Sequence, residues 1–94
     1  MKQQQMQHPS RRQDLIVRPL DDEVIVLDPQ AEMVHALNPT ARAIWDLLDG
    51  RHGMAELVEA VCGRFDVRPE QAEKDIQALL ELFRSRNLLD APLP

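Results

Sequence analysis

Residues 37–50, with the sequence LNPTARAIWDLLDG, constrain the fold of this chain more than any other segment. Asn38 can cap a helix by accepting a hydrogen bond from a free amide of its first turn. Pro39 suits the first helical position, where no amide donor is needed. The apolar residues that follow recur at the spacing of one helix face: Ala41, Ile44, Trp45 and Leu48. We expect Gly50 to end this helix, because glycine readily adopts the left-handed conformation beyond a helix C-terminus.

The residues before this helix predict a small antiparallel sheet. Three apolar runs, at 15–17, 24–27 and 33–37, are too short for helices, and the first two are rich in β-branched residues. We expect Arg18 and Pro19 to close the first strand. Pro29 favours a tight connection between the second and third, which would then form a hairpin.

Two further helices are predicted after residue 50. Residues 54–62 carry apolar side chains at helical spacing, and Pro69 opens a third helix that runs to about Arg86 and stops at Asn87. The chain is therefore expected to be an α+β protein with a winged-helix-like fold, a three-stranded antiparallel sheet followed by a three-helix bundle. We expect a flexible N-terminal tail at 1–13, one domain at 14–89 and a short C-terminal tail at 90–94.

The third predicted helix has more apolar residues than one core face requires. Its core face comprises Ala72, Ile76, Leu79, Leu80 and Phe83. Ala78 and Leu82 form a neighbouring stripe, flanked by Asp75 and Arg86. Leu82 either packs beneath Leu88 and Leu89 or borders a shallow apolar groove at the open edge of the hairpin. Such an edge could accept a partner's backbone as an added strand.

Charge and cysteine content narrow the function further. The formal net charge of −5, from 16 acidic and 11 basic residues, disfavours general attraction to nucleic acid or anionic membranes. A single cysteine, Cys62, cannot form an internal disulfide, which suits a reducing compartment. Because the first residues also have no secretory pattern, we expect a cytoplasmic protein.

The pattern across several elements closely resembles the PqqD family. It rests on residues 37–41 with Ile44 and Trp45, on residues 48–50, 56–58 and 75–76, and on residues 87–89. The resemblance implies a non-enzymatic peptide chaperone of three strands and three helices that binds the leader of a ribosomally made precursor peptide. The partner would be a radical S-adenosylmethionine (SAM) modifying enzyme. In the family's founding pathway, pyrroloquinoline quinone (PQQ) biosynthesis, the peptide is PqqA and the enzyme is PqqE.

The resemblance also implies a binding site. The leader would pair with the backbone of the third strand and rest against the third helix. The implied residues are Met33, Val34, His35, Ala36 and Leu37 on the strand, with Asp75, Ala78, Leu79 and Leu82 on the helix. Two features depart from the family pattern: Gly53 stands where many relatives cap the second helix with threonine, and the hairpin looks more like the broader family than the dedicated quinone-pathway members.

Other conspicuous residues favour structural roles. Trp45 lies among apolar neighbours and is expected to anchor the core, and Cys62 is expected to be a small buried residue. The spacing of His8, His35, His52 and Cys62 matches no compact metal motif. The carboxylates at 21–23 have no evident acid–base partner, so we expect no catalytic site, no metal and no cofactor.

Two alternatives to peptide binding remain open from the sequence. A DNA-binding winged helix would share the order of elements, but its third helix would begin with the acidic segment PEQAEKD. A homodimer could form through the edge strand or the Leu82 stripe, which is the surface that a peptide would use.

Overall fold

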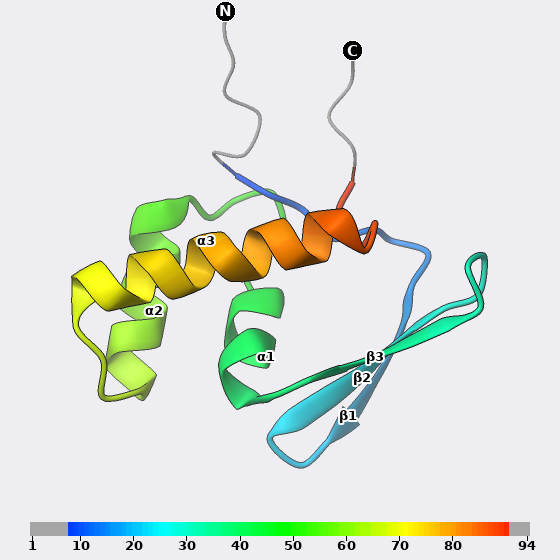
Figure 1. Cartoon of the computed structure of the whole chain (residues 1–94), viewed down its shortest axis with the longest axis horizontal. Helices are drawn as coiled ribbons and strands as arrows, with labels where there is room; N and C mark the ends of the chain where they lie inside the picture. The colour runs from blue at the N-terminus through cyan, green and yellow to red at the C-terminus, as the bar shows by residue number, and fades with distance from the viewer. Residues whose placement is uncertain (1–7, 91–94) are drawn as a thin grey trace, which may run out of the picture.

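The structure is a computed structural model that describes residues 8–90. Its elements are β1 (Ile16–Leu20), β2 (Glu23–Asp28), β3 (Met33–Leu37), α1 (Pro39–Trp45), α2 (Met54–Arg64) and α3 (Pro69–Ser85). Figure 1 shows the sheet at one end of the molecule and the helices gathered beside it. The predicted α+β class, with a three-stranded antiparallel sheet followed by three helices, is confirmed.

The strands are hydrogen-bonded in the order β1-β2-β3, and both pairs are antiparallel. Residues Val17, Val26 and His35 align across the sheet, as do Pro19, Val24 and Leu37, and these alternate residues form the inner face that looks toward the helices. The outer face carries Ile16, Arg18, Leu20, Glu23, Ile25, Leu27, Val34 and Ala36. β1 extends past Arg18 and Pro19, where the sequence predicted its end. An edge strand tolerates proline because one side needs no amide donors.

The core lies between the inner face and the three helices. Val24, Val26 and Leu37 of the sheet join buried residues of every helix in one cluster. Trp45 of α1 is 1% exposed and meets Phe83 of α3 edge to face, with ring centroids 5.4 Å apart. The prediction that Trp45 anchors the core is confirmed, and this aromatic contact fixes α3 against α1. Cys62 is only half-buried, at the margin of the core.

The first helix begins as predicted and ends earlier. The side chain of Asn38 accepts a hydrogen bond from the Ala41 amide at 2.9 Å, and Pro39 follows in the first turn. α1 nevertheless stops at Trp45. A turn follows the helix, and Leu48 after this turn is buried in the core. Gly50 has the expected positive φ of 83°, but within the connector to α2, where its amide donates to the carbonyl of Pro9 at 3.1 Å.

The other helix ends follow local signals. At the start of α2, Gly53 has no capping side chain, and the Glu56 carboxylate accepts from the Gly53 amide at 2.8 Å instead. α3 starts at Pro69, and Asn87 follows its end with φ of 60°. The amides of Asn87 and Leu88 donate to the carbonyls of Arg84 and Phe83, which completes a Schellman motif.

Part of the segment 1–13, which the sequence predicted as a flexible tail, contacts the rest of the domain. Residues 1–7 and 91–94 lie outside the described residues. Ser10 and Arg11 form isolated β-bridges with Asp49 and Leu89, and the side chain of Arg11 donates to the carbonyl of Trp45 at 2.7 Å. This segment is poor in apolar residues, but its amides and guanidinium groups satisfy carbonyls that the helix ends leave free.

Candidate functional site

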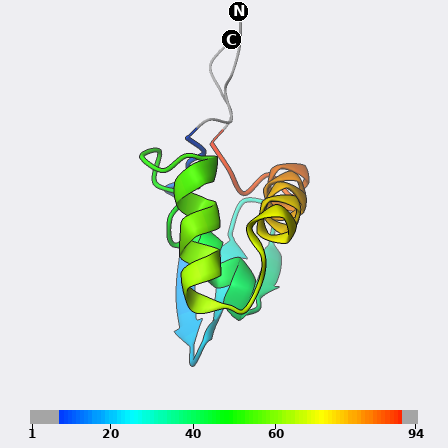
Figure 2. The ribbon, with the colours of Figure 1, turned by 90° about the vertical axis from the view of Figure 1, so that its left-hand side faces the viewer.

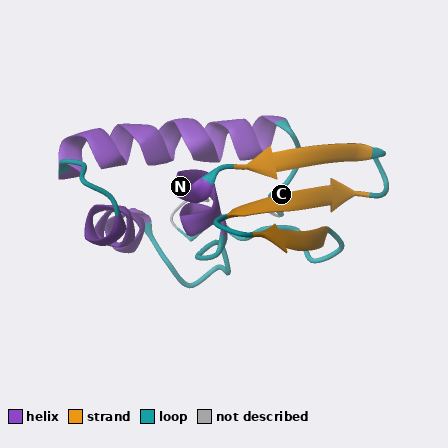
Figure 3. Cartoon of the chain, turned by 90° about the horizontal axis from the view of Figure 1, so that it is seen from below, coloured by secondary structure: helices purple, strands orange, loops and turns teal. Residues whose placement is uncertain are grey.

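The outward edge of β3 has no neighbouring strand among residues 8–90. β3 lies at one side of the sheet and pairs only with β2. Figures 2 and 3 show this edge on the side of the molecule where α3 runs. Strand edges expose unpaired amides and carbonyls, which can be completed by another strand.

The side chains of β3 divide between the two faces. His35 and Leu37 are buried, with 4% and 6% of their surface exposed, so a partner could use only their backbone groups. Val34 lies on the outer face and is 63% exposed, and Ala36 is exposed beside it. Met33, at the start of the strand, is 51% exposed.

On α3, the predicted division into two stripes is visible. Ala72, Ile76, Leu80 and Phe83 are buried, and Leu79 is half-buried at the margin. Asp75 and Ala78 are exposed, and Leu82 is 41% exposed although Leu88 and Leu89 are both buried. The alternative in which Leu82 packs beneath Leu88 and Leu89 is therefore wrong.

The C-terminal end of α3 approaches the middle of β3. Nη1 of Arg86 lies 3.4 Å from Nδ1 of His35, which joins the two elements directly. Arg86 follows Leu82 by four residues, so the two share one side of the helix. The N-terminal half of α3, which contains Asp75, extends past the end of the sheet (Figures 1 and 3). Leu82 of α3 and Arg86, which follows the last residue of this helix, thus lie on the side of β3. The sequence analysis named Arg86 only as a flank.

His35 contains a buried polar atom without a hydrogen-bond partner. A guanidinium group can only donate, so the contact with Arg86 makes Nδ1 of His35 the acceptor and leaves the ring proton on Nε2. Nε2 is buried and has no partner. A buried donor without a partner lowers the stability of the folded state. This donor belongs to β3, the strand whose outward edge is unpaired among residues 8–90.

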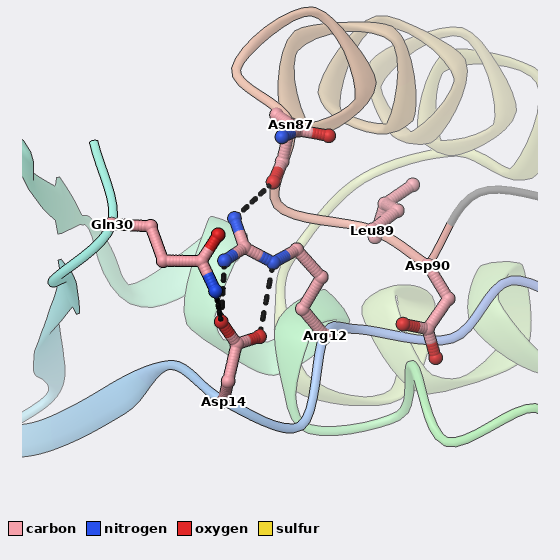
Figure 4. A pocket seen from close by; sticks show the side chains of 6 residues that line it. All are labelled: Arg12, Asp14, Gln30, Asn87, Leu89 and Asp90. Atoms are coloured by element: carbon pink, nitrogen blue, oxygen red, sulfur yellow. Dashed lines mark hydrogen bonds and ion pairs between the residues drawn. The ribbon is translucent and has the colours of Figure 1, made fainter.

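A shallow surface pocket lies where the N-terminal segment, the β2–β3 turn and the segment after α3 meet. Figure 4 shows its lining of Arg12, Asp14, Gln30, Asn87, Leu89 and Asp90. Arg12 forms ion pairs with Asp14 and with Asp28, and donates to the carbonyl of Asn87 at 2.8 Å. The hydrogen bonds from Arg12 hold the pKa of both carboxyl groups below the usual range for aspartate. These polar groups satisfy one another, which favours a structural role for the pocket.

Other acidic groups of the described residues lie exposed at two places on the surface. Asp21, Asp22 and Glu23 are exposed at the β1–β2 turn. Among the described residues, no group of three histidine, cysteine or carboxylate side chains could hold a metal ion. The start of α3 exposes Glu70, Glu73 and Asp75, which would repel a phosphate backbone. No helix within residues 8–90 is long and apolar enough to cross a bilayer.

Comparison with known proteins identifies a family and two solved structures that this chain resembles. Residues 23–89 match the sequence model of the family described as coenzyme PQQ synthesis protein D (PqqD). The structure described as "TbiB1 in Complex with the TbiA(beta) Leader Peptide" superposes with a TM-score of 0.79 at 25% identity, covering 90% of this chain and 99% of the other. The structure described as "Lasso peptide synthetase B1 complexed with the leader peptide" gives 0.77 at 27% identity, covering 89% and 99%. No curated protein matches the sequence.

Proposed function

This chain belongs to the PqqD family, and from that premise we propose that it binds the leader of a ribosomally made precursor peptide and presents it to a modifying enzyme. The leader adds to the sheet as a strand beside β3. The observation that carries the proposal is the open edge of β3 next to an exposed apolar side chain, Leu82, on α3.

The backbone of β3 and the side chains of α3 make different contributions to peptide binding. Backbone groups of residues 33–37 supply hydrogen bonds that any peptide sequence can form, so they give affinity without much selectivity. Side chains that alternate along the added strand would face Leu79 and Leu82 on one side, and their fit gives selectivity. Ala78 widens the surface, and Asp75 lies farther along α3.

The structural neighbours support this assignment. Both are described as complexes with a leader peptide, and both cover nearly all of their own length in the superposition. The whole of each neighbour thus corresponds to this small fold, which suits a binding module more than an enzyme. We therefore propose that the chain has no catalytic activity of its own.

The enzyme that receives the peptide is proposed to be of the radical SAM type, as in PQQ biosynthesis, and the complex to be cytoplasmic. The single cysteine, half-buried in α2, suits a reducing compartment. No further cofactor is required by the module itself, because backbone pairing and apolar contacts are enough to hold a peptide strand.

The direct test is titration with synthetic leader peptides encoded beside this gene, followed by calorimetry and by amide chemical shifts. We expect binding, with shift changes concentrated at residues 33–37 and around Leu82. A scrambled leader of the same composition serves as the control. If none of the leaders releases heat or perturbs β3, the proposed function is wrong.

A further inference from the structure

Arg86 places a positive charge beside the open edge of β3. Its side chain takes part in none of the ion pairs within residues 8–90, although the chain carries a net charge of −5. Arg84 differs, because its Nη2 lies 3.4 Å from Oε1 of Glu81. Arg86 is exposed, and its Nη1 lies 3.4 Å from Nδ1 of His35. The guanidinium group therefore has donors left for an acceptor from outside the described residues.

His35 fixes the position of this guanidinium group. The imidazole is 4% exposed on the inner face of β3, with Nδ1 toward Arg86 and Nε2 without a partner. A leucine at this position would avoid the buried unpaired donor but would lose the contact with Arg86. The histidine thus lowers the stability of the fold while it holds a charged group beside the strand edge. A local loss of stability of this kind is common at binding sites.

The spacing of residues on α3 matches the spacing of residues on an added strand. Leu82 and Arg86 are four positions apart, which is about 6 Å along a helix axis, and alternate residues of a strand are about 6.6 Å apart. α3 and β3 run in opposite directions (Figures 1 and 3). The step from Arg86 back to Leu82 therefore follows the direction from His35 toward the C-terminal end of β3. An added strand would present one side chain to Arg86 and the next on the same face to Leu82.

We propose that Arg86, positioned by His35, binds a carboxylate side chain of the leader peptide, and this proposal rests on the proposed function. The carboxylate belongs to an aspartate or glutamate that faces α3 beside the middle of β3. An apolar residue two positions away along the leader contacts Leu82. Guanidinium and carboxylate groups are matched in shape and charge, and they can pair through two parallel hydrogen bonds.

The distribution of charge on α3 favours one register of the leader. Glu73 and Asp75 are exposed in the N-terminal half of the helix, which extends past the end of the sheet. An acidic side chain of the leader is repelled there and attracted at Arg86. Backbone pairing alone allows an added strand to shift by two residues without turning its faces. One ion pair at a fixed position removes that freedom, so Arg86 determines which leaders fit and in which register.

Calorimetric titration of the full chain with synthetic leaders encoded beside this gene tests the proposal. Each leader is amidated at its C-terminus, so that its only carboxylates are side chains. We expect Arg86→Gln, which removes the charge, to bind about tenfold more weakly than the parent chain. Replacing the acidic residues of the leader one at a time by their amides should reveal one position with a similar loss. That replacement should have no further effect on binding to Arg86→Gln.

The matched control is Arg84→Gln, which changes the same residue type near the same end of α3. Arg84 pairs with Glu81 and not with His35, so this variant should bind leaders as the parent chain does. Circular dichroism checks that each variant folds. If Arg86→Gln does not fold, the amide replacements in the leader still test the ion pair, because they leave the protein unchanged.

Two variants of His35 test its positioning role. His35→Leu should bind the leader about threefold or more weakly although its Tm rises, because the guanidinium group loses the acceptor that orients it. His35→Asn keeps an acceptor near the place of Nδ1 and should bind within about twofold of the parent chain. A loss of affinity together with a gain of stability does not arise from damage to the fold. Unchanged affinity of His35→Leu would show that the imidazole does not position Arg86.

The outcomes distinguish this proposal from the proposed function. If no leader binds the parent chain, the proposed function is wrong and the carboxylate site is wrong with it. If a leader binds the parent chain and Arg86→Gln equally well, peptide binding holds and the role of Arg86 is overturned. A leader without acidic residues that binds as tightly as the acidic ones would overturn that role as well.

Discussion

Arg12 donates a hydrogen bond from Nη1 to Oδ2 of Asp28 at 2.9 Å, and this ion pair ties the N-terminal segment to the last residue of β2. Asp28 is 2% exposed and also accepts from the amides of Gln30 and Ala31 in the hairpin turn. The same guanidinium reaches the carbonyl of Asn87 after α3. One side chain therefore connects the hairpin that ends in β3 with the helix that lies beside it.

This connection makes stability depend on pH in the acid range. Hydrogen bonds from Arg12 lower the pKa of Asp28 and Asp14 in the folded chain. Their contribution is complete above the unfolded value of about 3.9 and is lost as the pH falls through the lower folded value. We expect urea stability to change little from about pH 7 to pH 5 and to fall below about pH 4.

The variant Asp28→Asn isolates the ion pair, because an asparagine oxygen can still accept from Gln30 and Ala31. We expect a lower Tm at neutral pH and a shallower loss of stability in acid than in the parent chain. Asp66→Asn, at an exposed position in the α2–α3 connector, is the control. Identical acid profiles for the parent and Asp28→Asn would contradict the assigned role.

Leu82→Asp is predicted to weaken leader binding without unfolding the chain. Leu82 is 41% exposed, so the folded state tolerates a charge there, but burying that charge against a bound peptide is unfavourable. Loss of one leucine contact of about 1.5–3 kcal/mol corresponds to roughly tenfold to hundredfold weaker binding by calorimetry. Gln77→Asp introduces the same group on the opposite flank of α3 and should bind normally. Unfolding of Leu82→Asp would show instead that Leu82 belongs to the core.

Substitutions of Asn87 are predicted to change stability according to how readily the new residue adopts a left-handed backbone conformation. Its φ of 60° is left-handed, a conformation that costs roughly 1–2 kcal/mol for most residues and nothing for glycine. Asn87→Ala should therefore reduce the free energy of unfolding by about 1 kcal/mol, and Asn87→Gly should be neutral or stabilising. Chemical denaturation of both variants measures the difference. Equal stability of the two would show that the backbone conformation is not limiting.

His35→Leu is predicted to stabilise the fold. Nε2 of His35 is a buried donor without a partner, and an apolar side chain of similar volume removes that penalty, by about 1 kcal/mol. Thermal unfolding should show a higher Tm for His35→Leu, whereas Arg86→Ala should lower the Tm, because it leaves Nδ1 of the buried His35 without its donor. A marked drop in Tm for His35→Leu would mean that the imidazole contributes packing that leucine cannot supply.

Local chemistry made much of the fold predictable. Asn38 and Pro39 start α1, Pro69 starts α3 and Asn87 ends it, because capping and proline geometry depend only on adjacent residues. The helical spacing on α3 correctly separated a buried face from a stripe that contains Leu82. The end of α1 was wrong, because burial of Leu48 required only a turn in contact with the core and not a continued helix.

The contribution of the N-terminal segment could not be derived from the sequence. Arg11 bonds to a carbonyl 34 residues away and Arg12 to one 75 residues away, and no local pattern records such partners. The same holds for the proximity of Arg86 to His35, which are 51 residues apart.

The sequence by itself determined which residues form strands and helices, since periodicity, capping and turn formation act within a few residues. Only the tertiary structure decided which strand has an open edge, which face of the sheet the helices leave uncovered, and which end of α3 lies beside β3. Those outcomes depend on how the elements pack, and packing is set by contacts between residues that are distant along the chain.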